Sequence, residues 1–487
     1  MSSEPVSQEA VDAVIVGSGP NGLAAAVVLA QAGARVLVLE GHGEPGGGTR
    51  TAELTLPGFK HDVCSAVHPM GVLSPLFRSL PLEAHGLRWL DSGVSAAHPL
   101  DGQPSVLLRA RLEETAEGLG ADARAYRSMI APFLGEPHGL MRDLLAPLGL
   151  PRHPYLMLRF GLLAMRSAVG LGRARFQGDR ARAMFAGCAA HSILPLEAPF
   201  TAALGVIFCL ASHIAPWPVA AGGSDAVHRA LVSLLHSLGG RIQTGVWVRS
   251  LADLPPARVV LFDTDPRTLA RVAGPALPAG YVRRLLRYRY GPGSFKLDLA
   301  LDGPIPWRDP ETARASTVHL GGTLDEIAAA EAAVSRGEHP ERPYVLLCQQ
   351  SALDPSRAPS GRHTGYAYCH VPPGSTLDQS EAILRQIERF APGFRDRILA
   401  VHRTGPQDLE RYNPAFVGGA VTGGSADWRQ LFTRPVARLN PYTTPNRRIY
   451  LCSAATPPGG GVHGMCGYHA AQTALRRMDR IVPAPFL

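Results

Sequence analysis

A glycine-rich turn near the N-terminus constrains the fold of this chain more than any other feature. Gly17-Ser18-Gly19-Pro20-Asn21-Gly22 follows the apolar run 11–16 and opens a segment rich in Ala, Leu and Val at 20–32. A second apolar run follows at 35–39. Strand, helix and strand within about 30 residues predict a βαβ unit with a parallel sheet.

The turn has the spacing G-x-G-x-x-G, which is weak alone but informative between a strand and a helix. Gly17 permits a tight turn, Gly19 lets a pyrophosphate approach the backbone, and Gly22 lets the helix pack on the strand. The helix N-terminus offers N–H donors and partial positive charge. Glu40 ends the second strand, where an acid hydrogen-bonds ribose hydroxyls. The sequence therefore predicts a dinucleotide site, with an ordinary glycine turn as the alternative.

Two further glycine-rich segments favour FAD over NAD. One is 46–51, soon after Glu40, and the other is 459–467, between the last predicted strand and the last predicted helix. The second can present another helix N-terminus to a ligand. A second helix N-terminus would stabilise FAD, because the isoalloxazine ring carries negative charge when it is reduced.

Composition excludes several classes of protein. Among the 487 residues, 46% are apolar and 18% charged, which is typical of a globular chain of two or three domains. The 48 basic and 40 acidic residues are spread along the chain, so nucleic-acid binding is not expected. The seven cysteines form no CxxC pair, which argues against a disulfide scaffold and favours the reducing cytoplasm.

Two uncharged stretches, 13–34 and 198–224, are interpreted as buried segments. Glycines interrupt the first, and the apolar part of the second is shorter than the ~20 residues that span a bilayer.

Several segments together resemble the FAD-dependent phytoene desaturase-like oxidoreductases. These segments are the first glycine turn, the GGGTRT turn, PGFKHD at 57–62, GGSDAV at 222–227, and the terminal YLCSAATPPGGGVHGMCGYHAA. The family includes carotenoid desaturases and isomerases and retinol saturase. The branch that the chain most resembles is that of pyridine nucleotide-disulfide oxidoreductase domain-containing protein 2.

The resemblance implies an α/β fold: a glutathione-reductase-type Rossmann FAD-binding domain with an inserted, largely helical plus β-sheet substrate domain. The FAD-binding domain would take residues 1–110, 221–290 and 416–487. The inserted domain would take a helical part at 111–220 and a sheet part at 291–415.

The resemblance also implies the cofactor contacts. Gly17, Ser18, Gly19, Pro20, Asn21 and Gly22 would hold the pyrophosphate, and Glu40 the adenosine ribose. Gly47, Gly48 and Thr49 would approach the cofactor, and Val248, in a strand after the GGSDAV helix, would contact adenine. Gly461, Val462, His463 and Met465 would meet the flavin.

The chain departs from the family pattern in ways that bear on these contacts. Many relatives have Arg where this chain has Gly48, and Arg50 is a candidate replacement. No acidic residue follows the last strand at 452–456 for the ribityl chain. The hairpin expected before the strand at 258–262 is cut to 252–257.

The implied activity is removal of a hydride from a C–H bond of a largely apolar small molecule by FAD, at flavin N5. Oxygen, a quinone or another acceptor would then take the electrons. Three alternatives stay open: a redox-neutral isomerase, an NAD-dependent dehydrogenase, and a flavin-bearing interaction protein without turnover.

Two residues are candidate catalytic residues. His463 would stabilise the anionic reduced flavin. Lys296 is one of only two lysines, with Lys60, among the 48 basic residues, so an arginine is not an adequate replacement there. Lys296 lies on the opposite side of the predicted strand 294–301 from Phe295 and Leu297. That side faces either the cavity beneath the flavin or solvent.

Two further patterns concern metal binding and membrane binding. His61, Cys64 and His68, like His463, Cys466 and His469, lack a fourth ligand at metal-site spacing, so no metal is predicted. Arg159, Arg166 and Arg173 fall on nearly one side of a continuous helix. They are interpreted either as arginines of a packed helix or as a basic surface in peripheral contact with membrane lipid.

Overall fold

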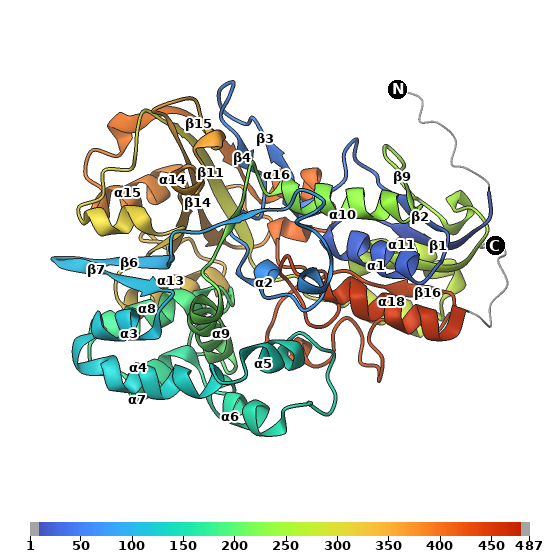
Figure 1. The fold of residues 1–487 in the computed structure, drawn as a ribbon, viewed down its shortest axis with the longest axis horizontal. Coiled ribbons are helices and arrows are strands. Elements are labelled where there is room, and N and C mark those ends of the chain that lie inside the picture. The colour runs from blue at the N-terminus through green and yellow to red at the C-terminus, as the bar shows by residue number, and fades with distance from the viewer. Residues whose placement is uncertain (1–8, 479–487) are drawn as a thin grey trace.

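The computed structural model describes residues 9–478, and a parallel sheet organises the lobe on the right of Figure 1. Its order is β16-β10-β1-β2-β9, and every pair is parallel. The strands are β1 (Val11–Val16), β2 (Val36–Leu39), β9 (Arg241–Gln243), β10 (Ala257–Phe262) and β16 (Ile449–Leu451). Carboxyl ends of parallel strands meet at one edge, so the segments after β1, β2, β10 and β16 lie together there.

Helices cover both faces of this sheet. One face packs against α1 (Pro20–Gln31), α10 (Asp225–Ser237) and α18 (Met465–Met478). The other packs against α11 (Pro266–Ala273) and α12 (Ala279–Leu285). Both faces are apolar because the strands consist mostly of Val, Ile, Leu and Ala.

A seven-stranded sheet organises the other lobe, in the order β15-β11-β14-β13-β12-β6-β7. The strands are β6 (Val94–Leu100), β7 (Gln103–Arg109), β11 (Gly293–Leu301), β12 (Thr317–Leu320), β13 (Val345–Cys348), β14 (His363–Val371) and β15 (Ile398–Thr404). Phe295, Leu297, Leu299 and Leu301 of β11 share a core with α15 (Ser380–Phe390). The alternation predicted for this strand is confirmed.

The other side of this sheet carries the helical block at the lower left of Figure 1. Its helices are α3 (Leu112–Glu117), α4 (Ala123–Ile130), α5 (Pro137–Leu144), α6 (Pro154–Ala164), α7 (Ala168–Arg175), α8 (Asp179–Ala190) and α9 (Thr201–Ile214). The helix α13 (Leu324–Ser335) joins the same core.

Short elements complete the described chain. The strand pairs are β3 (Thr51–Ala52) with β4 (His61–Asp62), and β5 (Trp89–Leu90) with β8 (Val219–Ala220). The remaining α-helices are α2 (Pro69–Val72), α14 (Gln350–Leu353), α16 (Pro406–Tyr412) and α17 (Trp428–Leu431).

Two sequence predictions are corrected here. The first domain piece, 1–110, included β6 and β7, but β6 pairs with β12 and β7, so both belong to the second sheet. The strand expected to contain Val248 ends at Gln243. Gly245 turns with a φ of 72°, and Val246 then donates its N–H to the Glu40 carbonyl.

The three arginines do not share a helix. Arg159 lies on α6, Arg173 lies on α7, and Arg166 lies in the link between them. Arg173 forms an ion pair with Asp325 at 2.8 Å. Among residues 9–478, no helix combines the length and apolar character needed to cross a bilayer.

Candidate functional site

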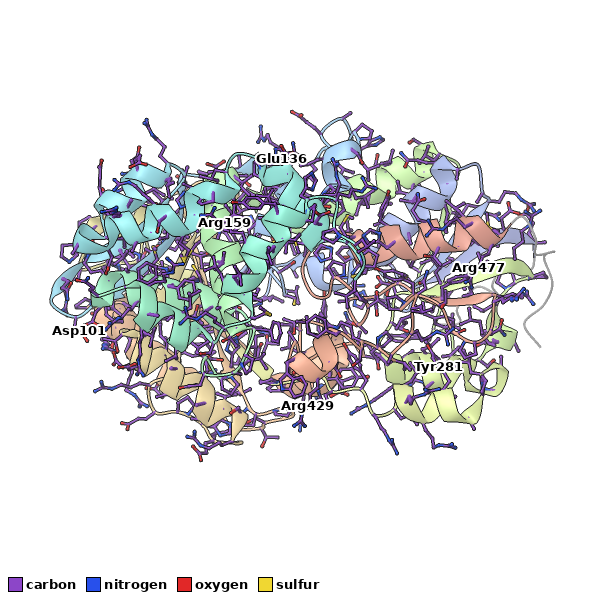
Figure 2. The ribbon with its side chains drawn as sticks, turned by 90° about the horizontal axis from the view of Figure 1, so that it is seen from below. Asp101, Glu136, Arg159, Tyr281, Arg429 and Arg477 are labelled. Atoms are coloured by element: carbon purple, nitrogen blue, oxygen red, sulfur yellow. The ribbon has the colours of Figure 1, made fainter. Side chains whose placement is uncertain are left out.

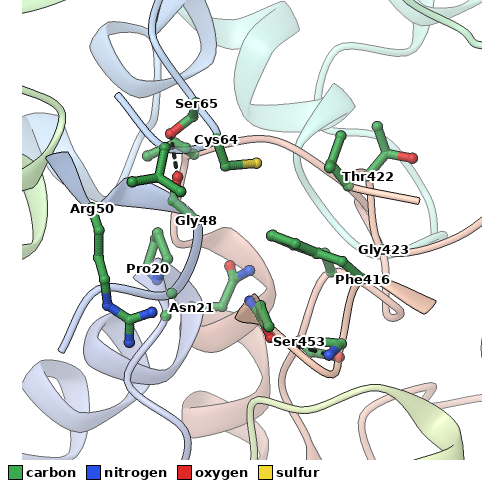
Figure 3. A pocket seen from close by; sticks show the side chains of 18 of the residues that line it. Pro20, Asn21, Gly48, Arg50, Cys64, Ser65, Phe416, Thr422, Gly423 and Ser453 are labelled. Atoms are coloured by element: carbon green, nitrogen blue, oxygen red, sulfur yellow. Dashed lines mark hydrogen bonds between the residues drawn. The ribbon is translucent and has the colours of Figure 1, made fainter. Parts of the chain in front are cut away.

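A cavity of about 430 Å³ extends from the carboxyl edge of the parallel sheet to the second sheet. Its walls come from segments far apart in sequence, including 16–21, 39–42, 47–50, 246–248, 263–265, 453–455 and 461–462. Figure 3 shows part of this wall, with Phe416 lying between Gly48 and the loop that carries Thr422 and Gly423.

The first glycine turn is packed as tightly as predicted. Gly17 has a φ of 99°, and a Cβ on Gly22 would lie 2.3 Å from the Gly17 carbonyl oxygen. A Cβ on Gly19 would lie 2.6 Å from Oδ2 of Asp263. Substitution of these glycines would therefore displace backbone or a buried carboxyl group.

Asp263 is a residue of this edge that the sequence analysis missed. It follows β10 directly, and its Oδ2 accepts the N–H of Gly22 at 2.8 Å. Burial, with the nearby Glu40 charge, raises the pKa of Asp263 to about 7, although the Gly22 and Gly19 N–H groups act in the opposite direction. No sequence signal indicated it, because only the parallel pairing of β1 with β10 brings Asp263 next to Gly17.

Glu40 lines the cavity at the end of β2. One carboxylate oxygen accepts the N–H and hydroxyl of Ser18 at 2.9 and 2.5 Å. The other accepts the N–H of His42 at 2.8 Å and lies 3.4 Å from Nη2 of Arg50. These donors fix the carboxylate at the wall, as a ribose contact requires.

Val248 also lines the cavity, but it lies in the loop after β9 rather than in a strand. Its neighbour Trp247 covers Gly41, where a Cβ would lie 2.7 Å from the indole ring. Trp247 lines the cavity and is 55% exposed. The sequence analysis missed this aromatic wall because nothing indicated that the chain turns back at Gly245.

Gly47 and Gly48 line the next part of the cavity. A Cβ on Gly47 would lie 3.0 Å from the Cα of Gly19, and one on Gly48 would lie 3.4 Å from the Phe416 ring. Tyr412 donates its hydroxyl to the Gly47 carbonyl at 2.8 Å.

Arg50 occupies the same wall. Its guanidinium donates to the Glu44 carbonyl and lies 5.4 Å from the centre of the Tyr412 ring. Thr49, by contrast, turns into the protein and donates to the Gly46 carbonyl, so its side chain is not a wall of the cavity.

The C-terminal glycine turn contributes differently from the prediction. Gly461 and Val462 line the cavity. His463 is buried, and its Nδ1 accepts the N–H of Met465 at 3.0 Å, at the start of α18. Burial lowers the pKa of His463 to about 4, so the ring is neutral. Met465 packs into the core beneath the parallel sheet. The imidazole therefore caps a helix, and the role predicted for these two side chains at the flavin is not supported by their positions.

The far end of the cavity is aromatic. His191, Phe208, Trp217, Tyr366 and Tyr368 form its wall in the second lobe. Leu346, Cys348 and Thr317 complete it. Such a surface favours an apolar ligand.

Lys296 lies where the two ends of the cavity meet, and it is 2% exposed. Its ammonium donates to the carbonyls of Asp62 and Val63, both at 2.8 Å, and forms an ion pair with Asp298 at 2.9 Å. It also lies 4.5 Å from the centre of the Tyr366 ring. The solvent-facing alternative is therefore excluded. The catalytic role of Lys296 remains a prediction. Its contacts indicate a structural role as well, since Lys296 holds the loop 62–63 against β11.

Asp62, from the PGFKHD segment, joins this loop to three other segments. Its carboxylate accepts two bonds from the Arg357 guanidinium, both at 3.1 Å. It also accepts the Thr51 hydroxyl and the N–H of Ser224, each at 2.8 Å. Burial opposes ionisation, but Arg357 lowers the pKa of Asp62, so the carboxylate stays charged. The motif is thus a structural junction beside the cavity.

The cavity residues fit FAD. Asn21, at the first turn of α1, carries a buried Oδ1 without a hydrogen-bond partner. The close approach of Gly47 to Gly19 forms a cradle that side chains would fill. Ser18, Gly19 and Pro20 would hold the pyrophosphate, Glu40 the ribose, and Gly461 and Val462 the isoalloxazine.

Comparisons with known proteins agree with this arrangement. Residues 15–80 match the NAD(P)-binding Rossmann-like domain. Pyridine nucleotide-disulfide oxidoreductase domain-containing protein 2 of Rattus norvegicus is 26% identical over 561 residues, covering 96% of this chain and 94% of that protein. Phytoene dehydrogenase of Streptomyces griseus is 28% identical over 84% of this chain and 80% of its own.

The chain is a homologue of these oxidoreductases. A solved oxidoreductase of Methanosarcina mazei has the same fold, with a TM-score of 0.65 at 16% identity, and the match covers 96% of this chain and 100% of that one. The predicted resemblance and the predicted fold class are confirmed. In this chain, all seven cysteines are free thiols.

Proposed function

We propose that this protein is an FAD-dependent oxidoreductase that removes a hydride from a C–H bond of a largely apolar small molecule. One observation carries the proposal. A single cavity joins the dinucleotide-binding edge of the parallel sheet to an aromatic chamber in the second lobe. An NAD-dependent enzyme for a polar substrate has no need of that chamber.

When bound, FAD supplies an acceptor at N5 for the substrate hydride, and the electrons then pass to oxygen, a quinone or another acceptor. The chain's own residues bind and orient. Phe208, Trp217 and Tyr368 would exclude water around the substrate. Lys296 would keep the loop 62–64, including Cys64, in place at the junction.

A substrate screen scored by flavin bleaching tests this proposal. The holoenzyme is mixed anaerobically with apolar alkenes, aldehydes and polyenes, and with amines and hydroxy acids for comparison. We expect apolar compounds to bleach the flavin absorption. Phe208→Trp should slow bleaching, because it narrows the chamber, while Leu286→Trp at an exposed position should not.

Each other outcome identifies an alternative. Anaerobic turnover of substrate without net reduction of the flavin would indicate an isomerase. Binding of NAD in place of FAD would indicate a dehydrogenase of the nicotinamide type. A flavin that no compound reduces would indicate an interaction protein.

We also propose a peripheral contact with membrane lipid, made by α6 rather than by the arginine face. Tyr155, Leu158, Leu162 and Met165 recur at helical spacing and are 55–70% exposed. Arg159, labelled on the helical block in Figure 2, belongs to the same helix and is exposed, as are Arg142, Arg152 and Arg166 in the neighbouring sequence. Apolar and basic residues on one surface helix favour an anionic bilayer surface.

A further inference from the structure

A cluster of buried histidines lies behind the aromatic chamber and takes no part in the proposed reaction. His98 of β6, His319 of β12 and Cys188 of α8 are all 2% exposed or less. Their ligand atoms lie within 4.8 Å of one another, and within residues 9–478 no other three His, Cys, Asp or Glu residues meet in this way. We propose that these three side chains bind one zinc ion.

The spacing of the nitrogen atoms suits a tetrahedral ion. Nδ1 of His319 lies 3.2 Å from Nε2 of His98. Two imidazole nitrogens at Zn–N distances of ~2.0–2.1 Å would be about 3.3 Å apart. The thiolate of Cys188 adds a sulfur donor to the two nitrogens, a set that zinc prefers, and a water would take the fourth position, as at other zinc sites with three protein ligands. The thiol releases its proton to solvent as the zinc–sulfur bond forms, and no oxidation is involved.

His319 already has the outer partner that a zinc-bound histidine needs. With Nδ1 on the ion, Nε2 carries the ring proton, and Nε2 of His191 lies 3.0 Å away as its acceptor. Outer hydrogen bonds of this kind set the tautomer and orientation of ligand histidines. His191 is therefore a positioning residue for the ion, and it also lines the chamber.

The backbone leaves room for the two imidazoles. A Cβ on Gly187 would lie 2.5 Å from Cε1 of His98 and 2.8 Å from Nδ1 of His319. Glycine before Cys188 thus lets both rings approach α8. The ion would tie this helix to the paired strands β6 and β12, and through His191 it would fix one wall of the substrate chamber.

Sequence spacing cannot reveal this site, because its three ligands lie on separate elements. The two His/Cys groups that spacing suggested lie elsewhere, one between β4 and the start of α2 and the other from the glycine turn at 459–464 into α18. The proposed ion does not depend on the proposed reaction, so its test leaves the flavin proposal untouched.

The test is zinc uptake by the full-length holoenzyme after chelator treatment. The protein is equilibrated with zinc, passed into metal-free buffer, and its zinc content and melting temperature are measured. We expect one zinc per chain and a higher melting temperature than for the metal-free form. Metal-free parent protein that retains no zinc and melts unchanged would overturn the proposal.

Variants locate the ion. Cys188→Ser and His319→Asn should lose zinc retention and its effect on melting, while their FAD content shows that they fold. Cys369→Ser, at another buried cysteine, and His236→Asn, at an exposed histidine, should behave as the parent. His191→Phe should weaken zinc affinity by ~10–100-fold without abolishing it. Equal zinc retention in Cys188→Ser and the parent would also overturn the proposal.

Discussion

Gly19 is the residue on which the dinucleotide site depends most directly. A side chain there would press on the Asp263 carboxyl group, because a Cβ on Gly19 would lie 2.6 Å from Oδ2. We predict that Gly19→Val yields folded protein with less than about a tenth of the parent's bound FAD. Gly161→Val is the control, because a Cβ on Gly161 would meet no neighbouring atom within 4 Å. The flavin absorbance per chain measures both, and full occupancy in Gly19→Val would exclude this turn as the cofactor site.

Asp263 should make FAD binding depend on pH. Its pKa is raised to about 7 by burial, so the carboxyl is neutral below that pH and charged above it. The charged form repels an anionic pyrophosphate at the same helix N-terminus. FAD affinity should therefore fall as pH rises through about 7, by at most ~10-fold per unit.

Asp263→Asn should bind FAD with equal affinity across this range. A linked effect on stability has the same direction. The folded carboxyl holds its proton between pH 3.8 and about 7, where the unfolded chain does not, so the cofactor-free protein loses stability as pH rises through that interval. The measurement is the FAD affinity of the parent and of Asp263→Asn from pH 6 to 9. The same pH dependence in both proteins would show that the Asp263 carboxyl group is not responsible for it.

At the scale of elements, strand β11 and the loop after β4 are joined through one buried ammonium. Lys296→Met would leave the buried Asp298 carboxyl without its cationic partner, and the two loop carbonyls unbonded. Losing one partner of a buried pair costs ~3–5 kcal/mol of unfolding free energy. Adding Asp298→Asn should recover more than half of that loss in urea denaturation. If Lys296→Met has the same free energy of unfolding as the parent, the Lys296–Asp298 pair does not stabilise the fold.

Lys296→Arg separates positioning from simple stability. A planar guanidinium cannot reproduce three contacts at 2.8–2.9 Å around one nitrogen. We predict that this variant folds and binds FAD but reduces its flavin with substrate at least ~10-fold more slowly, a loss of ~1.4 kcal/mol. The rate at saturating substrate is the measurement, and a parent-like rate would remove Lys296 from the reaction.

The exposed stripe of α6 is the element that would meet a membrane. We predict that the protein sediments with vesicles containing phosphatidylserine, and that added salt weakens this binding. Leu158→Asp combined with Leu162→Asp should weaken it at least ~10-fold. Leu286→Asp, at a leucine of similar exposure in the other lobe, is the control. Equal sedimentation of all three proteins would exclude α6 as the contact.

At the scale of the whole molecule, local patterns predicted the parallel sheet well. The strand 11–16, the helix from Pro20 and the last helix lie where their patterns indicated, because each adjoins a glycine turn that marks one of its ends. The alternation of β11 likewise predicted which residues face the core.

Non-local pairing accounts for what the sequence could not reveal. Strands β6 and β7 belong to the second sheet because β6 pairs with β12, more than 200 residues away. His463 was placed at the flavin because its turn faces the cavity, yet its ring turns back to cap α18. Trp247 and Asp263 became visible only once the turn at Gly245 and the edge of the parallel sheet were known.

The proposed reaction depends on FAD binding in the cavity that joins the two lobes. The flavin content of the purified full-length protein tests it most directly, by absorption of the native protein and of the flavin released on denaturation. We predict a yellow protein that carries, or can be loaded with, one FAD per chain. A colourless protein that takes up no FAD at micromolar concentration would contradict the account.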